Sequence, residues 1–164
     1  MTSTLERPAP RFSLLGLIVL AAVVASLSAS GDARAAEQTA EGAQARSTLT
    51  VRGTRFGRIL FDGRGRALYA FTRDRRGGPS QCHGACARAW PVYFAGGKLR
   101  AGKGVKRSRI GTVRRPNGRR QVTYNGWPLY YYVGDRSPGQ VLCQNVDEFG
   151  GTWLVVRPSG GLVR

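Results

Sequence analysis

The sequence predicts a mainly β protein, built from two β-hairpin or meander repeats that pack as a small antiparallel sandwich or barrel-like domain. Two observations support this prediction. The apolar runs are short and are separated by turn residues, which favours strands over helices. The pattern Leu-Tyr-x-aromatic-x-x-Asp also occurs twice, at residues 68–74 and 129–135, and Gly, Pro and Ser follow each copy. A chain of 164 residues suits one small domain.

The first elements of the domain are predicted from the segment GRILFDGRGRALYAFT, residues 57–72. Its two apolar runs flank the turn sequence Asp-Gly-Arg-Gly at residues 62–65, which indicates a hairpin. The segment CHGACARAWP follows at residues 82–91, and its Ala and Arg content predicts one short helix near Cys82–Trp90.

The second half of the domain begins with three apolar runs between residues 109 and 133. They are joined by Asn117-Gly118 and Asn125-Gly126, and Asn-Gly is the strongest short-range hairpin signal because both residues tolerate positive φ. We therefore predict a three-stranded meander. The run GTWLVVRP at residues 151–158 predicts one more strand.

The N-terminal segment has the layout of a secretory signal peptide with a signal helix. Arg7 and Arg11 precede the uncharged run FSLLGLIVLAAVVASL at residues 12–27, and a small-residue Ala-Arg-Ala site follows at 33–35. We predict that residues 1–35 are a signal peptide removed by cleavage. The alternative is an uncleaved anchor, because the run is at the short limit of what crosses a bilayer. No Cys lies near the predicted cut, so lipid attachment is not expected there.

The mature chain is predicted to divide into a tether and one domain. Residues 36–46 are small and polar and offer little to bury, so we expect a disordered tether. The folded domain is predicted at residues 47–164, with repeat units at about 57–97 and 109–161. Isolated hairpins are only marginally stable in water, so the two units are expected to pack against each other.

The motif residues of the two copies correspond in pairs: Tyr69 with Tyr130, Phe71 with Tyr132, and Asp74 with Asp135. The aromatic residues are expected to pack in the core; the alternative is a stacking platform for sugar rings or bases. The aspartates are expected to cap the turn that follows each strand. The alternative for them is a catalytic carboxylate pair.

In these features the chain resembles a family of bacterial secreted repeat proteins with a Tyr-x4-Asp motif, also known as predicted lipoproteins. The stretches ALYAFTRD and CHGACARAWP carry the resemblance in the first unit. In the second unit QVTYNGWPLYYYVGD and CQNVDEFGGTWLVVRPSG carry it. The resemblance implies export, two repeats and a mostly β domain, and it implies no established activity. The lipoprotein label rests on a lipobox Cys that this sequence lacks, so a lipid anchor is not carried over.

The three cysteines are Cys82, Cys86 and Cys143, and thiols of an exported protein are expected to oxidise. A bond between Cys82 and Cys86 would close a short loop, whereas Cys143 reaches either of them only if the repeats fold face to face. Three cysteines cannot all pair within one chain. The alternative is a metal or redox site formed by the three thiols and His83, the only His.

Positive charge is the remaining signal, because 26 Lys and Arg against 9 Asp and Glu give a formal net charge of +17. The densest stretch lies at residues 99–120 and is either a solvated loop that keeps the protein soluble or a surface for anions. Four arginines of its hairpin tip are the candidate anion-binding residues: Arg114, Arg115, Arg119 and Arg120. Export makes specific nucleic-acid binding unexpected.

These observations favour an exported, noncatalytic module that associates with the cell envelope by binding anionic polymers or lipid headgroups. We expect neither enzymatic activity nor a cofactor nor a bound metal. The alternative function is an extracytoplasmic redox or metal-binding protein that uses Cys82, His83, Cys86 and Cys143.

Overall fold

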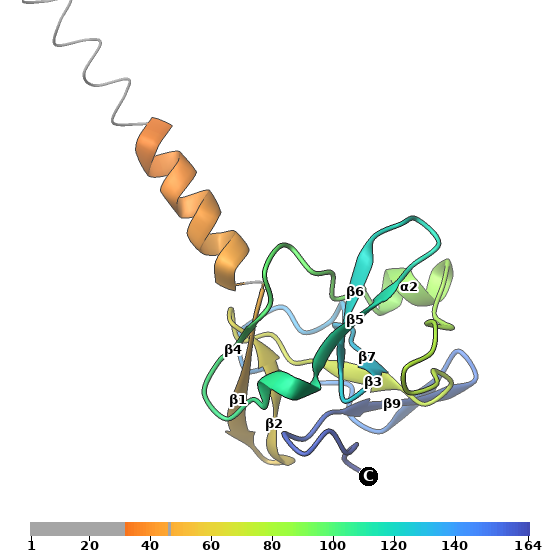
Figure 1. Ribbon diagram of the computed structural model, residues 1–164. Coiled ribbons are helices and arrows are strands. Elements are labelled where there is room, and N and C mark those ends of the chain that lie inside the picture. The colour runs from red at the N-terminus through yellow and green to blue at the C-terminus, as the bar shows by residue number, and fades with distance from the viewer. Residues whose placement is uncertain (1–31, 46) are drawn as a thin grey trace, which may run out of the picture. The chain divides into compact units, whose positions relative to one another are not determined.

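The computed structural model describes residues 32–45 and 47–164 and confirms the mainly β fold (Figure 1). The chain forms two units, residues 1–40 and residues 41–164. The signal-peptide prediction falls mostly on residues 1–31, outside the described residues. Within the described part of the chain, no helix is long and apolar enough to cross a membrane.

Residues 32–45 form a helix, which differs from the disordered tether predicted for residues 36–46. Ala, Glu and Gln dominate this segment, and all three are strong helix formers. Residues 32–41 of the helix are exposed, so they gain little from tertiary packing. The tether prediction considered only what the segment can bury and overlooked its local helix propensity.

The first sheet is built on a hairpin that the sequence analysis did not identify. Strand β1 (Thr48–Thr54) pairs antiparallel with β2 (Gly57–Asp62), and the short β4 (Arg100–Ala101) pairs in parallel with β1 on its other edge. Leu49 on β1 and Leu60 on β2 are fully buried.

The predicted hairpin after β2 is present as a turn closed by a buried carboxylate. Asp62 Oδ1 accepts the N–H groups of Arg64 and Arg66 at 3.0 and 2.9 Å. The backbone of Phe61 then bridges to Ala67 in antiparallel fashion. An Asp side chain that satisfies nearby backbone donors is a common way to close such a turn.

The second sheet joins the two repeats. Strand β3 (Tyr69–Phe71) carries the first motif and pairs antiparallel with β9 (Gly151–Val155), the last strand of the second repeat. Strand β8 (Val146–Glu148) lies on the other edge of β9. Residues more than 80 positions apart therefore share one ladder, with Phe71 opposite Trp153.

The third sheet confirms the predicted meander of the second repeat. Strands β5 (Ile110–Arg114), β6 (Arg120–Tyr124) and β7 (Trp127–Pro128) follow each other in the order β5-β6-β7. The turn between β6 and β7 contains Asn125 with φ of 50° and Gly126 with φ of 83°. Both lie in the left-handed region that a two-residue hairpin turn requires, which explains the Asn-Gly sequence.

The two short helices of the described domain are α2 (Ala85–Ala89), which confirms the predicted helix, and the 3-10 turn η1 (Arg107–Arg109) just before β5.

The motif segments separate two hydrophobic cores, because successive side chains of a strand point to opposite sides. The aromatic core contains, among others, Tyr69, Phe71, Trp90, Tyr130 and Trp153. The second core contains, among others, Leu49, Leu60, Leu68, Tyr124 and Leu129.

Candidate functional site

The two copies of the repeated motif meet at their tyrosines. The N–H of Tyr69 donates to the carbonyl of Tyr130, and the N–H of Tyr130 donates to the carbonyl of Tyr69, both at 2.9 Å. Two equivalent residues that exchange both backbone hydrogen bonds are related by a local twofold axis. The repeats therefore pack as pseudo-symmetric partners around this pair.

The side chains of the motif follow the same symmetry and cross between the repeats. The hydroxyl of Tyr69 donates to Asp135 Oδ2 at 2.7 Å, and the hydroxyl of Tyr130 donates to Asp74 Oδ2 at 2.6 Å. All four side chains are buried, with at most 2% of their surface exposed. The Tyr and Asp of one motif thus bond the other motif and not each other.

The second oxygen of each carboxylate holds the loop that follows its own strand. Asp74 Oδ1 accepts the N–H of Gln81 at 2.6 Å, and Asp135 Oδ1 accepts the N–H of Leu142 at 3.0 Å. Both donors lie seven residues after the Asp, so this contact also repeats. The predicted capping role is present here, although the bonded amide is farther along the chain than a turn cap.

The aromatic residues of the motif enclose a pair of stacked indoles. Trp90 and Trp153 lie parallel with ring centroids 3.9 Å apart. Phe71 stacks on Trp153 at 4.3 Å, and the equivalent Tyr132 packs on Trp90 at 4.9 Å. The two motif tyrosines meet the indoles edge-on at 5.3 and 5.1 Å. Both indoles are fully buried, so these rings form core and not a surface for stacking ligands.

Burial sets the ionisation of this network. It raises the pKa of Tyr69 and of Tyr130 well above the ordinary value, and the bonded aspartates add to the effect. Burial also raises the pKa of Asp74 and Asp135, against the opposing hydrogen bonds from Gln81 and Tyr69 respectively. The phenols stay protonated donors, and the carboxylates are closed off from a substrate in solution.

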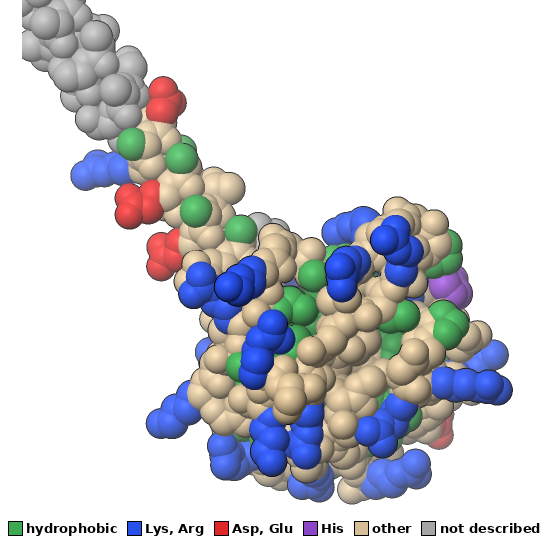
Figure 2. Space-filling view, in the orientation of Figure 1, with side chains coloured by type: hydrophobic (Ala, Val, Ile, Leu, Met, Phe, Trp, Pro, Cys, Tyr) green, Lys and Arg blue, Asp and Glu red, His purple; other side chains and the backbone are tan. Residues whose placement is uncertain are grey.

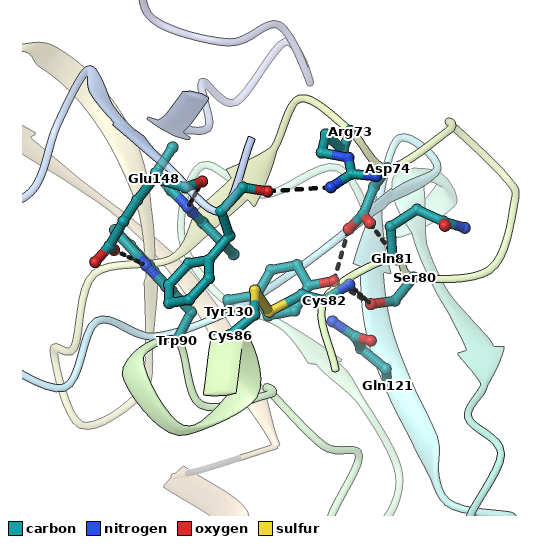
Figure 3. Close-up of a disulfide and its surroundings, with 12 residues drawn as sticks. Arg73, Asp74, Ser80, Gln81, Cys82, Cys86, Trp90, Gln121, Tyr130 and Glu148 are labelled. Atoms are coloured by element: carbon teal, nitrogen blue, oxygen red, sulfur yellow. Dashed lines mark hydrogen bonds between the residues drawn. A yellow bond between two sulfur atoms is a disulfide. The ribbon is translucent and has the colours of Figure 1, made fainter. Parts of the chain in front are cut away.

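One disulfide lies beside the first carboxylate. Cys82 and Cys86 are bonded, with 0% and 6% of their surfaces exposed. Figure 3 shows the bridge next to Tyr130 and Ser80, on the side of the network that belongs to the first repeat. The hydroxyl of Ser80 hydrogen-bonds the hydroxyl of Tyr130. This bridge fixes the segment that leads from the motif into α2.

The hypothesis of a metal or redox site made of all three cysteines and His83 is not supported by this geometry. Cys82 and Cys86 are consumed by their bond, His83 is exposed, and Cys143 is a free, half-buried thiol. Burial raises the pKa of the Cys143 thiol, which disfavours the reactive thiolate. Within residues 32–45 and 47–164, no group of three or more His, Cys, Asp or Glu could hold a metal ion.

Arg115 corrects the predicted set of anion-binding residues, because the residue is buried, with 8% of its surface exposed. It donates to Ser80 Oγ, to the carbonyl of Cys82 at 2.6 Å and to Gln121 Oε1 at 3.2 Å. Gln121 in turn donates to the carbonyl of Leu129 at 2.9 Å. Arg115 therefore ties the β5–β6 hairpin to the first repeat and is unavailable to a ligand.

The other three arginines of the hairpin tip are exposed. Arg114 and Arg120 lie directly opposite each other on β5 and β6. Arg119 places its guanidinium 3.5 Å from the centroid of the Phe94 ring. The sequence analysis did not identify the buried partners Ser80 and Gln121, since neither belongs to the repeated motif and neither has a local signal.

The fold and the site together define the class of protein: one chain carries two β repeats, and the motif that both repeats share forms the interface between them. The chain belongs to the family described as a secreted repeat of unknown function, which matches residues 51–93 and 111–157, more than half of the chain. The two matched ranges are the two repeats seen in the structure, so the predicted family, the repeats and an extracytoplasmic location are confirmed. No curated protein and no solved structure matches the chain.

Proposed function

We propose that this protein is an exported, noncatalytic module that associates with the cell envelope by binding anionic polymers through its basic surface. The observation that supports the proposal is the distribution of charge. Residues 47–164 hold 22 Lys and Arg but only five Asp and Glu. Asp62, Asp74 and Asp135 are buried with at most 2% exposed, so most of the compensating charge lies inside. Lys and Arg side chains are spread over the face of the domain shown in Figure 2.

The tip of the β5–β6 hairpin is the proposed contact surface. Arg114 and Arg120 are cross-strand neighbours, and like charges directly opposite each other repel. Arg120 is held by two bonds to Thr112 Oγ1 at 2.9 and 2.7 Å, which keeps it in the ladder. An anionic group between the two guanidinium groups would relieve their repulsion, and Arg is suited to bidentate contacts with phosphate and carboxylate.

A noncatalytic role agrees with the state of the motif carboxylates. Asp74 and Asp135 are the residues of the repeat that acid-base chemistry would need, and both are buried in hydrogen bonds to tyrosines. A general acid or base must reach the proton it transfers. In this arrangement the two carboxylates serve the packing of the repeats.

Polymers are favoured over lipid surfaces as the partner. A membrane-surface site combines basic residues with exposed apolar side chains that enter the bilayer interface. In the described ranges only Val133, Leu142 and Phe149 are large exposed hydrophobic residues, and none lies on the β5–β6 hairpin. The basic tip therefore offers charge without an insertion surface.

The test compares two triple variants with equal loss of charge. Arg114→Gln/Arg119→Gln/Arg120→Gln removes the tip, whereas Arg52→Gln/Arg55→Gln/Arg58→Gln removes three exposed arginines of the β1–β2 hairpin. Binding to soluble poly(glycerol phosphate) is measured by titration calorimetry between 50 and 200 mM salt. The wild-type affinity should fall steeply with salt, and the tip variant should lower the slope of log K against log salt by about 3.

The β1–β2 variant should bind nearly as well as the wild type. Equal losses in both variants would show that the tip has no special role. Affinity that does not change with salt would contradict the proposal as a whole, and tighter binding to anionic lipid vesicles than to the polymer would favour a membrane partner.

A further inference from the structure

A polar hollow of about 480 Å³ lies away from the hairpin tip, where three chain segments converge. We call it the three-loop hollow. Its walls come from the loop after β3 (residues 76–77), from η1 and the start of β5 (residues 108–111), and from the end of β6 with its turn (residues 123–126). The repeated motif does not account for it, because none of its lining residues lies in residues 68–74 or 129–135.

Two arginines stand in this hollow, and the backbone holds each of them in place. The Nε of Arg76 donates to the carbonyl of Asn125 at 2.9 Å. The Nη1 of Arg109 donates to the carbonyl of Pro158 at 2.7 Å. Each guanidinium keeps further N–H groups that have no acceptor within residues 32–45 and 47–164. An arginine that is already oriented loses less entropy when it binds a ligand.

The shape of the hollow depends on the turn between β6 and β7. The N–H of Gly77 donates to the carbonyl of Gly126 at 2.8 Å, which brings the first-repeat loop against the turn. A Cβ on Gly126 would lie 2.9 Å from the nitrogen of Gly77, so only Gly permits this approach. The N–H of Asn125 also donates to the carbonyl of Arg109 at 2.7 Å. The three segments therefore form one connected wall.

The groups that line the hollow suit an oxyanion. Besides Arg76 and Arg109 its lining includes Ser108, Thr123 and Asn125, and none of the five carboxylates of residues 47–164 lines it. Guanidinium groups form short, charge-assisted hydrogen bonds with phosphate, and hydroxyl and amide donors complete its coordination. Because no carboxylate lines the hollow, no negatively charged side chain in its wall repels a bound anion.

We propose that the three-loop hollow binds one phosphate group of the anionic polymer, with Arg76 and Arg109 as the two gripping residues. The inference rests on the proposed function and assigns it a shaped subsite, which adds chemical selection to the diffuse attraction of the hairpin tip. Phosphate is favoured over carboxylate because a tetrahedral group presents oxygens to donors on three sides, and the donors here come from three segments.

The direct test uses inorganic phosphate as the probe and the full mature domain. Phosphate is titrated into ¹⁵N-labelled protein at constant ionic strength, with acetate as the comparison anion. The amide signals of Gly77, Asn125 and Gly126 should shift with phosphate and saturate, and acetate should shift them much less. Arg76→Gln/Arg109→Gln should abolish the saturable shift.

The matched control is Arg52→Gln/Arg58→Gln, which removes the same number of charges from exposed positions of the β1–β2 hairpin, outside both the hollow and the hairpin tip. This variant should retain the phosphate-induced shifts. In the polymer assay the hollow variant should lose at least tenfold in affinity for poly(glycerol phosphate) relative to the control. Circular dichroism and thermal melting show whether each variant is folded, and Arg→Lys variants at the same two positions should restore part of the binding.

The outcomes separate this inference from the proposed function. Phosphate shifts at the hollow without any polymer binding would support the subsite and contradict the envelope role. Polymer binding that is equal in the hollow variant and in the control would overturn the subsite and leave the basic tip as the contact. Small shifts spread over all exposed arginines, equal for phosphate and acetate, would also overturn it.

Discussion

The two motif carboxylates have the same bonds but different surroundings. Asp74 and Asp135 each accept one tyrosine hydroxyl from the other repeat and one amide from their own loop. Around Asp74 there are also a disulfide and the buried Arg115, whose positive charge lowers the pKa of Asp74 in opposition to burial. Near Asp135 the positive charge that opposes the effect of burial on the pKa is that of Arg66, whose guanidinium lies over the Tyr131 ring.

The difference continues in the residues six and eight positions beyond each Asp. The first repeat has Cys82 in a disulfide, whereas the equivalent Cys143 in the second repeat is a free thiol. Ser80 of the first repeat bonds both Tyr130 and Arg115, and its equivalent, Val141, is apolar and packs in the aromatic core. The hydrogen bonds of the motif therefore define how the two repeats pair, and each repeat supports these bonds with different residues.

The largest expected effect comes from removing a motif tyrosine. Tyr69→Ala and Tyr130→Ala should each lower the free energy of unfolding by about 3–5 kcal/mol, since a large buried ring is lost and a cavity remains. Chemical denaturation at pH 7 measures the loss. The Phe variants keep the ring and should lose only about 1–3 kcal/mol, because they leave a buried carboxylate without one donor. Unchanged melting temperatures in the Ala variants would refute the role of the two tyrosines in the core.

A smaller effect should distinguish the cysteines of the two repeats. The Cys82–Cys86 bridge closes a short loop, so Cys82→Ala/Cys86→Ala should cost about 2 kcal/mol by loop-closure entropy. Cys143→Ala, at a half-buried position without a bond, should cost less. Denaturation under oxidising and reducing conditions checks this, since reduction should affect the wild type and leave the double variant unchanged. Equal sensitivity of both variants to reduction would contradict the assigned pairing.

The smallest expected effect is a dependence of stability on mildly acidic pH. The pKa values of Asp74 and Asp135 are raised in the folded state, so the folded chain holds these two protons more tightly than the unfolded chain. Their contribution to stability is full below about pH 4, the unfolded value, and is lost as pH rises through the folded pKa values. Unfolding curves between pH 4 and 7 measure the slope. Asp74→Asn/Asp135→Asn should flatten it, and an unchanged slope in this variant would disprove the assignment.

The elements that the sequence predicted correctly depend on local signals. Asn125-Gly126 requires positive φ at two successive residues, and few turns other than a tight hairpin use such a pair. The repeated pattern around Tyr69 and Tyr130 likewise identified them as equivalent positions of two repeats. Strand β1 was not predicted because it lies outside the repeated motif, although its sequence TLTVR at residues 48–52 is the same kind of short, β-rich run.

The contacts that could not be predicted join residues far apart in the chain. Alignment of the repeats shows that Asp74 corresponds to Asp135, but it does not show whether Tyr69 bonds the Asp of its own repeat or of the other. Arg114 and Arg115 look alike in the sequence, yet one is exposed and the other buried. Burial of Arg115 requires acceptors from the distant segment that carries Ser80 and Cys82, and only the folded chain brings that segment against the hairpin.

The crossing of the tyrosine–aspartate bonds has a consequence for the history and assembly of such chains. A polypeptide with only one repeat would hold a phenol and a carboxylate whose partners both lie on another molecule, so it would have to associate with a second copy to satisfy them. Covalent linkage of the two copies replaces that encounter by an intramolecular one, at an effective concentration set by the short linker and typically in the millimolar range. Duplication within one gene therefore makes the pair independent of protein concentration, which is an advantage for a molecule that is diluted outside the cell.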